Sequence, residues 1–104
     1  MVCTEEFRMI TLQVGNDSHL PATLDEVYTL RTGSTQKLYF DQPFTEGRYV
    51  VLDDSYHSHL KNKEADFRFI GIKNNTVVVD QVFRIAGDNC HIIKKSGPDG
   101  VMVN

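Results

Sequence analysis

Alternating hydrophobic and polar positions run through most of the chain and indicate short β-strands. Residues 6–14 place Arg8, Ile10, Leu12 and Val14 on one face, which is the period of two expected of a strand with one buried side. Similar runs rich in β-branched and aromatic residues follow, and Gly, Pro, Asn and Asp separate them. The pattern predicts strands over residues 6–14, 22–31, 36–40, 48–52, 66–72, 76–85, 90–94 and 101–103.

Two of these strands carry the strongest signal and should form a hairpin. Residues 66–72 (DFRFIGI) and 76–85 (TVVVDQVFRI) lie on either side of Lys73-Asn74-Asn75. A short polar connection of this type is typical of the turn that closes an antiparallel hairpin. Residues 22–31 fit either a strand or a short helix, and their β-forming residues Val27, Tyr28 and Thr29 favour the strand.

The pattern changes over residues 53–63, DDSYHSHLKNK, which favour a short helix. Asp54 can cap its start, and Tyr56 and Leu60 are four residues apart, so that they share one side. We expect one short helix near residues 54–62.

Many short strands without an alternation of strand and helix indicate two packed antiparallel sheets. We therefore predict an all-β fold, a seven- to eight-stranded antiparallel β-sandwich that forms a single domain over residues 1–104. The predicted core consists of Ile10, Leu12, Leu30, Leu38, Phe40, Val50, Leu52, Phe67, Phe69, Val77, Val79, Phe83 and Ile92.

Charge and hydropathy exclude two classes of partner. The net charge is −3, and the 11 Lys and Arg residues are scattered singly apart from Lys94-Lys95, so no basic stripe is available for nucleic acid. No apolar run approaches the roughly 18 residues that a membrane-spanning helix needs. We predict neither nucleic-acid binding nor a transmembrane segment.

The two cysteines, Cys3 and Cys90, allow two interpretations. If they pair, the bond closes most of the chain and contributes on the order of 4 kcal/mol in the chain-entropy model. Otherwise they are two unpaired thiols.

The most suggestive chemical cluster is His57-Ser58-His59 with Asp53 and Asp54 before it. Imidazoles and carboxylates are good ligands for zinc and related metals. Residues two apart on a helix point to nearly opposite sides, however, so the predicted helix counts against a shared metal ion. We predict no metal site and keep these four residues, with Tyr56, as weak binding candidates.

Other acids and nucleophiles give weaker signals. A Ser or Cys nucleophile could draw only on a loose pool of Cys90, His91, His57 and several Asp residues, and no G-x-S-x-G, P-loop or dinucleotide motif occurs. We predict no catalytic residues, no enzymatic activity and no cofactor. Loop carboxylates could hold calcium, but their spacing matches no EF-hand, and we interpret them as solvated acids: Asp17, Asp25, Glu26, Asp41, Asp53, Asp54, Asp88 and Asp99.

Aromatic residues are numerous enough that some should be exposed, where they could contact a carbohydrate or a protein. The set is Tyr28, Tyr39, Phe40, Phe44, Tyr49 and Tyr56.

The stretch VLDDSYHSHLKNKEADFRFIGIKNNTVVVDQVFRIAGDNCHIIKKSGPDG (51–100) and the opening CTEEFR (3–8) resemble a group of small exported proteins. These are short lipoprotein-type proteins of Gram-negative gut bacteria. Their β-sandwich is similar to transthyretin (prealbumin), to the regulatory domain of carboxypeptidases and to immunoglobulin-like domains. The resemblance implies a lipid anchor on an N-terminal cysteine, a place comparable to that of Cys3, and such an anchor excludes pairing with Cys90. It brings no catalytic residues.

These observations favour a non-enzymatic binding or accessory module of the cell envelope (periplasm or outer-membrane surface) or a secreted one. Its expected partner is a protein or glycan at the envelope, contacted through loops or a sheet edge. One alternative is a metal-dependent or hydrolytic site built from Asp53, Asp54, His57, His59 and also His91. Another is a structural subunit or a fragment of a larger surface protein.

Overall fold

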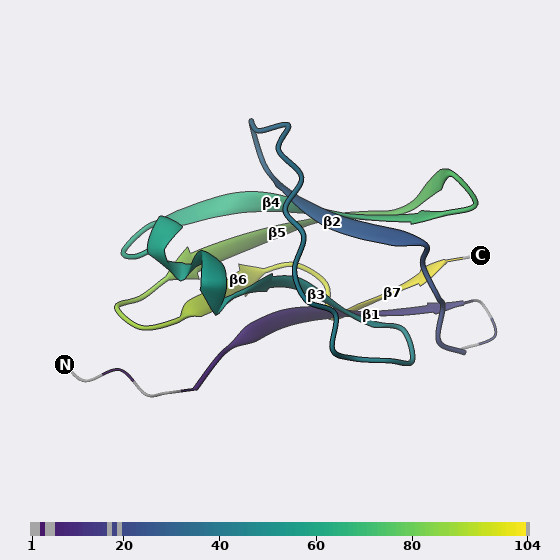
Figure 1. Cartoon of the computed structure of the whole chain (residues 1–104), viewed down its shortest axis with the longest axis horizontal. Helices are drawn as coiled ribbons and strands as arrows, with labels where there is room; N and C mark the ends of the chain where they lie inside the picture. The colour runs from purple at the N-terminus through teal and green to yellow at the C-terminus, as the bar shows by residue number, and fades with distance from the viewer. Residues whose placement is uncertain (1–2, 4–5, 17, 19, 104) are drawn as a thin grey trace.

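Two sheets pack face to face in the computed structural model, which describes residues 3, 6–16, 18 and 20–103 (Figure 1). One sheet has the strand order β3-β1-β7 and the other β2-β4-β5-β6. The all-β sandwich is therefore confirmed, with seven strands in the described part of the chain. The elements are β1 (Met9–Asn16), β2 (Glu26–Arg31), β3 (Arg48–Asp53), η1 (Asp54–His59), β4 (Glu64–Lys73), β5 (Thr76–Gly87), β6 (Ile92–Ser96) and β7 (Gly100–Val103).

One strand pair departs from the predicted antiparallel arrangement. β7 runs parallel to β1, with Val14 opposite Val101, whereas the other paired strands are antiparallel. The chain leaves β6 in one sheet, turns at residues 97–99 and enters the other sheet beside β1, where the Gln13 amide donates to the Asp99 carbonyl at 3.0 Å. Because the chain crosses between the sheets here, β6 and β7 do not form a hairpin, and β7 can lie parallel to β1.

The core lies between the sheets, and its largest members are Phe67, Phe69 and Phe83, all fully buried. Sequence alternation placed most of it correctly, because strands with one solvated face bury every second residue. The predicted core residues that are buried are Ile10, Leu12, Val50, Leu52, Phe67, Phe69, Val79, Phe83 and Ile92.

Four predicted core positions are not fully buried, although Phe40 packs against the core. Val77 is 53% exposed. A β-bulge lies between two neighbouring residue pairs of the ladder, Gly71–Val79 and Ile72–Val77, and it turns Val77 to the outer face. In β2 the buried residue is Thr29, whose hydroxyl donates to the Val51 carbonyl at 2.5 Å. The remaining three are only partly buried: Leu30, Leu38 and Phe40.

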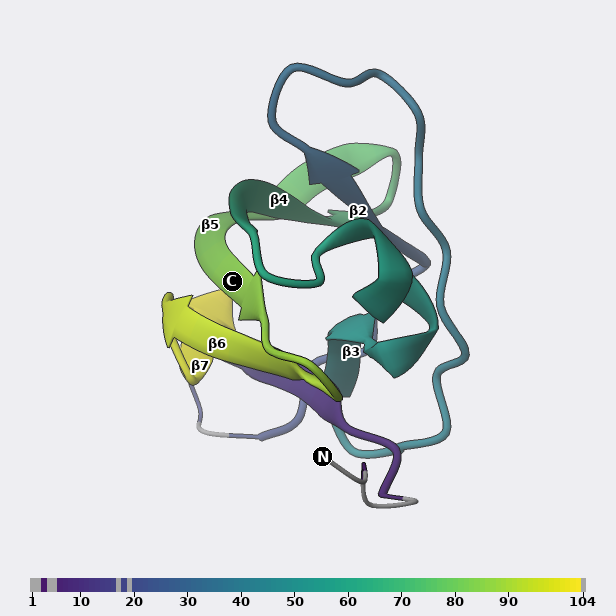
Figure 2. The same ribbon diagram turned by 90° about the vertical axis from the view of Figure 1, so that its left-hand side faces the viewer.

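The predicted strand over residues 36–40 is also wrong. Leu38 makes a single bridge to Thr29, with two backbone hydrogen bonds of 3.0 and 2.9 Å, and no ladder follows. This segment belongs to the long connection that crosses from β2 in one sheet to β3 in the other, so it passes over the sheet edge instead of running along it (Figure 2). The strand predicted over 22–31 is confirmed from Glu26 onward.

The predicted hairpin and helix are both found, with local differences. Asn74 and Asn75 form the two-residue turn between β4 and β5, and both have positive φ (52° and 62°), as a type I′ turn requires. The helix is the 3₁₀ turn η1, which ends at His59 and not near residue 62. Its cap is Asp53 instead of Asp54, because the Asp53 side chain accepts from the Ser55 amide.

Candidate functional site

η1 joins β3 to β4 across one end of the sandwich, the end that faces the viewer in Figure 2. Every binding candidate from the sequence lies on it or directly before it. The side chains nevertheless divide into two sets. Asp53, Asp54 and His57 bond to the protein itself, whereas Tyr56 and His59 line a surface pocket.

Asp54 is a buried tie between three segments of the chain. Its carboxylate accepts from the Arg8 amide (2.8 Å), the Ile92 amide (2.9 Å) and His91 Nδ1 (2.7 Å). The side chains of Asp54 and His91 are only 10% and 7% exposed. Burial alone would raise the pKa of Asp54, but the hydrogen bonds from Arg8, Ile92 and His91 outweigh it and hold that pKa below its ordinary value. This carboxylate is therefore a structural anion.

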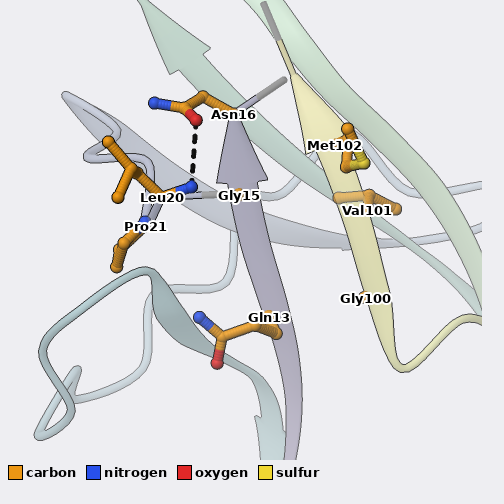
Figure 3. A pocket seen from close by; sticks show the side chains of 8 residues that line it. All are labelled: Gln13, Gly15, Asn16, Leu20, Pro21, Gly100, Val101 and Met102. Atoms are coloured by element: carbon orange, nitrogen blue, oxygen red, sulfur yellow. Dashed lines mark hydrogen bonds between the residues drawn. The ribbon is translucent and has the colours of Figure 1, made fainter. Parts of the chain in front are cut away.

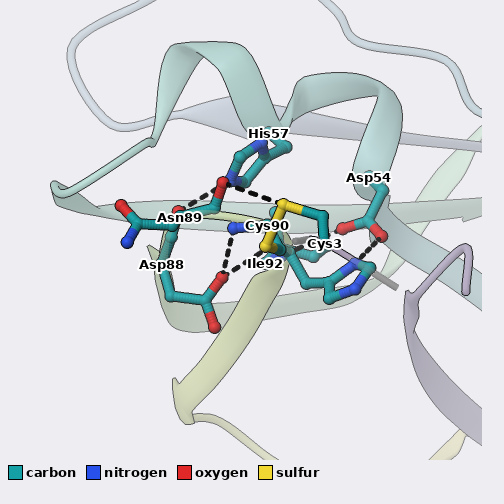
Figure 4. Close-up of a disulfide and its surroundings, with 8 residues drawn as sticks. Cys3, Asp54, His57, Asp88, Asn89, Cys90 and Ile92 are labelled. Atoms are coloured by element: carbon teal, nitrogen blue, oxygen red, sulfur yellow. Dashed lines mark hydrogen bonds and ion pairs between the residues drawn. A yellow bond between two sulfur atoms is a disulfide. The ribbon is translucent and has the colours of Figure 1, made fainter. Parts of the chain in front are cut away.

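Beside this tie, a disulfide joins Cys3 to Cys90, with sulfurs 2.06 Å apart (Figure 4). The sequence left open whether the two cysteines pair or stay as unpaired thiols, and the structure contains the disulfide. A lipid on the same Cys3 sulfur would exclude this bond. Cys90 is likewise occupied, so it offers no nucleophile.

The loop that carries Cys90 is fixed from both sides. Asp88 accepts from the His91 and Cys90 amides at 2.7 Å each, and these bonds lower the pKa of Asp88. His57 Nε2 lies 2.7 Å from the Asp88 carbonyl oxygen, to which it donates (Figure 4). His57 thus holds η1 onto the disulfide loop.

The convergence that a metal or hydrolytic site requires is absent from the described residues. His57 faces the Asp88 carbonyl, whereas the ring of His59 lies against Tyr56, so the two histidines diverge as expected for a helix. No three His, Cys, Asp or Glu side chains in residues 3, 6–16, 18 and 20–103 gather around one point. His91, the fifth residue of that hypothesis, is paired with Asp54.

The loop acids proposed as calcium ligands are likewise separated. Asp25 accepts from the Asn74 amide at 2.8 Å, and Asp99 pairs with Lys94. Asp17 lies outside the described residues. The interpretation as solvated acids fits Asp25 and Asp99, which are exposed, but it is wrong for Asp53 and Asp54, whose side chains are buried at the start of η1.

The two outward residues of η1 contribute to a pocket of about 310 Å³. The Tyr56 ring packs edge to face on the buried Phe67, with centroids 5.6 Å apart, and lies 4.7 Å from the His59 ring. Arg31 Nη1 donates to the Tyr56 hydroxyl at 3.4 Å. We call this the Arg31 pocket; it is lined by Arg31, Ser34, Gln36, Leu38, Tyr56 and His59.

Arg31 differs from most of the arginines in its surroundings. Arg8, Arg68 and Arg84 each form an ion pair with a carboxylate, but no described carboxylate lies within ion-pair distance of Arg31. Its positive charge is therefore directed at the pocket without neutralisation. Sequence reasoning missed Arg31, Ser34 and Gln36, since only the tertiary fold brings the end of β2 and the start of the 32–47 connection to η1.

Further pockets lie elsewhere on the surface. One sits where β1 and β7 end, between Leu20 and Pro21 on one side of β1 and Val101 and Met102 on the other (Figure 3). Leu20 and Met102 are 60% and 58% exposed, so this short sheet edge carries apolar surface. Another pocket lies next to Asp53.

Comparison with known proteins gives this site no precedent: no family model, curated protein or solved structure matches the chain. The resemblance to small exported lipoproteins thus stays a prediction. In the part of the chain that the structure describes, no helix has the length and apolar character to cross a membrane.

Proposed function

We propose that this chain is a non-enzymatic binding module of the cell envelope or a secreted one, and that the Arg31 pocket binds a sugar that carries a carboxylate. The observation that carries the proposal is the guanidinium of Arg31, which has no described acidic partner and lies beside an aromatic pair. Small-ligand pockets combine apolar and aromatic walls with a few polar groups in this way.

The pocket offers both elements that an acidic sugar needs. A guanidinium binds a carboxylate through two parallel hydrogen bonds, which gives geometric specificity as well as energy. The neighbouring ring of Tyr56, supported by Phe67, presents a flat apolar surface for the C–H face of a pyranose.

Polar residues of the 32–38 segment can form hydrogen bonds with the hydroxyl groups of the sugar. Ser34 Oγ already accepts from the Gln36 amide at 3.1 Å, so its own hydrogen is directed elsewhere and can donate to a ligand. The Gln36 side chain adds a donor and an acceptor.

The disulfide supports the compartment. Cys3–Cys90 is a long-range structural bond, and such bonds persist in oxidising environments such as the periplasm and the cell exterior. This argument is independent of the pocket.

The proposal is tested by titrating the oxidised protein with glucuronate, glucose and acetate, followed by amide shifts in NMR. Glucuronate should bind at least tenfold more tightly than glucose or acetate, and amides of residues 31–38 and 56–59 should shift. A tenfold difference corresponds to about 1.4 kcal/mol. The glucuronate should be recovered unchanged.

A matched pair of variants isolates the guanidinium. Arg31→Gln should weaken glucuronate binding at least tenfold, whereas Arg48→Gln should not, because Arg48 stacks on Phe44 away from the pocket. Equal affinity for glucuronate and glucose, or unchanged binding by Arg31→Gln, would refute the proposed ligand.

A further inference from the structure

A second pocket, of about 360 Å³, lies on the other side of η1's first residues. Leu38 lines the Arg31 pocket, while the next two residues, Tyr39 and Phe40, line this one. We call it the Asp53 pocket; its lining residues are Phe7, Met9, Tyr39, Phe40, Asp41, Pro43, Asp53 and Ser55.

The walls of this pocket are aromatic and apolar although much of their surface is exposed. Phe7 is 54% and Tyr39 61% exposed. Tyr39 is nevertheless held in place, because its hydroxyl donates to Glu26 at 2.7 Å and its ring lies 6.0 Å from that of Tyr28. A fixed aromatic ring at the surface is a preformed wall for a ligand.

One buried carboxylate contributes to the same pocket. Asp53 is only 7% exposed, and its Oδ1 accepts both the amide and the hydroxyl of Ser55. No described cationic side chain lies within ion-pair distance of it, and no described group donates to its Oδ2. Buried charges in proteins are ordinarily paired, so Asp53 contributes negative charge that the described protein does not neutralise.

We propose that the Asp53 pocket binds a quaternary ammonium group. Such a cation is attracted to aromatic faces and to the carboxylate, and it has no N–H groups whose hydrogen bonds to water would be lost. A primary ammonium is strongly hydrated, and the walls formed by Phe7, Met9 and Phe40 cannot replace that water. The chemistry of the walls therefore selects the methylated cation.

The decisive comparison is between choline and its neutral isostere 3,3-dimethylbutan-1-ol, with ethanolamine as the primary ammonium. We expect choline to bind at least tenfold more tightly than either, as measured by NMR titration of the oxidised protein. Choline affinity should fall at high salt, since the attraction is partly electrostatic. Equal binding of choline and the isostere, or no shift with choline, would overturn the proposal.

Two variants test the carboxylate and the aromatic wall of the pocket separately. Asp53→Asn keeps an oxygen that can accept from the Ser55 amide while it removes the charge, and we expect choline binding to weaken at least tenfold. Tyr39→Leu, at a residue that is 61% exposed, should also weaken it. Leu20→Ala is the control, since Leu20 is equally exposed (60%) and lies outside the pocket. If Asp53→Asn does not fold, Tyr39→Leu alone decides.

This inference is independent of the proposed sugar site. Arg31→Gln should leave choline binding unchanged, and Tyr39→Leu should leave glucuronate binding unchanged. A choline group can belong to a soluble compound or to a lipid headgroup. Cosedimentation with phosphatidylcholine vesicles assigns the headgroup, whereas binding of free choline without cosedimentation assigns the soluble compound.

Discussion

At the scale of single residues, Asp54 connects distant parts of the chain. Its two oxygens hold the segment before β1, the start of β6 and the side chain of His91. Because the folded state lowers its pKa, the ionised form stabilises the fold. That contribution is fully present above the pKa of the unfolded chain and is lost as the pH falls through the lower folded value.

Asp54→Asn should therefore destabilise the protein and flatten its acid response. At about pH 7 the free energy of unfolding should fall by about 3 kcal/mol, because a buried carboxylate that accepts three hydrogen bonds is replaced by an amide that cannot accept all of them. As the pH falls from the ordinary carboxyl range through the lower pKa of the folded state, the wild type should lose more stability than the variant, because only the wild type protonates this carboxyl. Urea titrations at several pH values measure both effects.

The control for this prediction is Asp41→Asn, at an exposed loop acid. It should change the free energy of unfolding by no more than about 0.5 kcal/mol. Parallel pH profiles for the wild type and Asp54→Asn would contradict the structural role of the ionised carboxylate.

At the scale of elements, the β4–β5 hairpin organises the larger sheet. It is the longest strand pair, its register runs from Glu64 opposite Ala86 to Lys73 opposite Thr76, and it contributes all three buried phenylalanines of the core. Its turn places two non-glycine residues at positive φ. Asn tolerates this conformation better than most residues, and Gly tolerates it best.

Substitutions at Asn75 should change stability in opposite directions. Asn75→Gly should raise the free energy of unfolding by about 0.5 kcal/mol, whereas Asn75→Val should lower it by at least about 1 kcal/mol, because a β-branched residue is strained at positive φ. Both values are measurable by urea unfolding. Stabilisation by Asn75→Val would show that the turn has another geometry.

The elements also show where sequence patterns are informative. The hairpin was predictable because its strands, turn and alternation lie together in the chain. Residues 36–40 have the same β-forming character, but the sheet offers Leu38 only one bridge, and propensity without a partner strand does not make a ladder.

The candidate site was predictable only in part, for the same reason. Tyr56 and His59 stand out in a local motif, whereas Arg31, the last residue of β2, meets them only in the folded chain. The lack of an acidic partner for Arg31 is a tertiary property that no local pattern contains. Similarly, two cysteines allow a bond, but only the fold brings Cys3 to Cys90.

For the whole molecule, the disulfide and the β1–β7 pair both connect the beginning of the chain to its C-terminal part. Cys3 is bonded across 87 positions to the loop between β5 and β6, and the last strand pairs with the first. Unlike the β1–β7 hydrogen bonds, the disulfide persists when the chain unfolds, so it removes freedom mainly from the unfolded chain.

Reduction should therefore lower the stability of the whole domain. The chain-entropy model for a loop of this length gives about 4 to 5 kcal/mol, which is a large fraction of the stability of a small domain. Urea unfolding with and without a reductant measures the loss, and the double variant Cys3→Ser with Cys90→Ser should match the reduced protein. A loss below about 1 kcal/mol would mean that the native contacts already hold this end of the fold.

The same bond also decides how the protein responds to mechanical load. A force applied to the two ends of the chain passes through the sulfur atoms from residue 3 to residue 90, so β1 to β5 lie outside the loaded path. Of the 104 residues, only the two before Cys3 and the 14 after Cys90 can be drawn out, and the second segment contains β6 and β7. At about 3.4 Å per residue the extension ends near roughly 50 Å. Under tension the oxidised domain would thus lose β6 and β7 while its remaining strands stay unextended. The disulfide therefore sets an upper limit on how far the chain can extend.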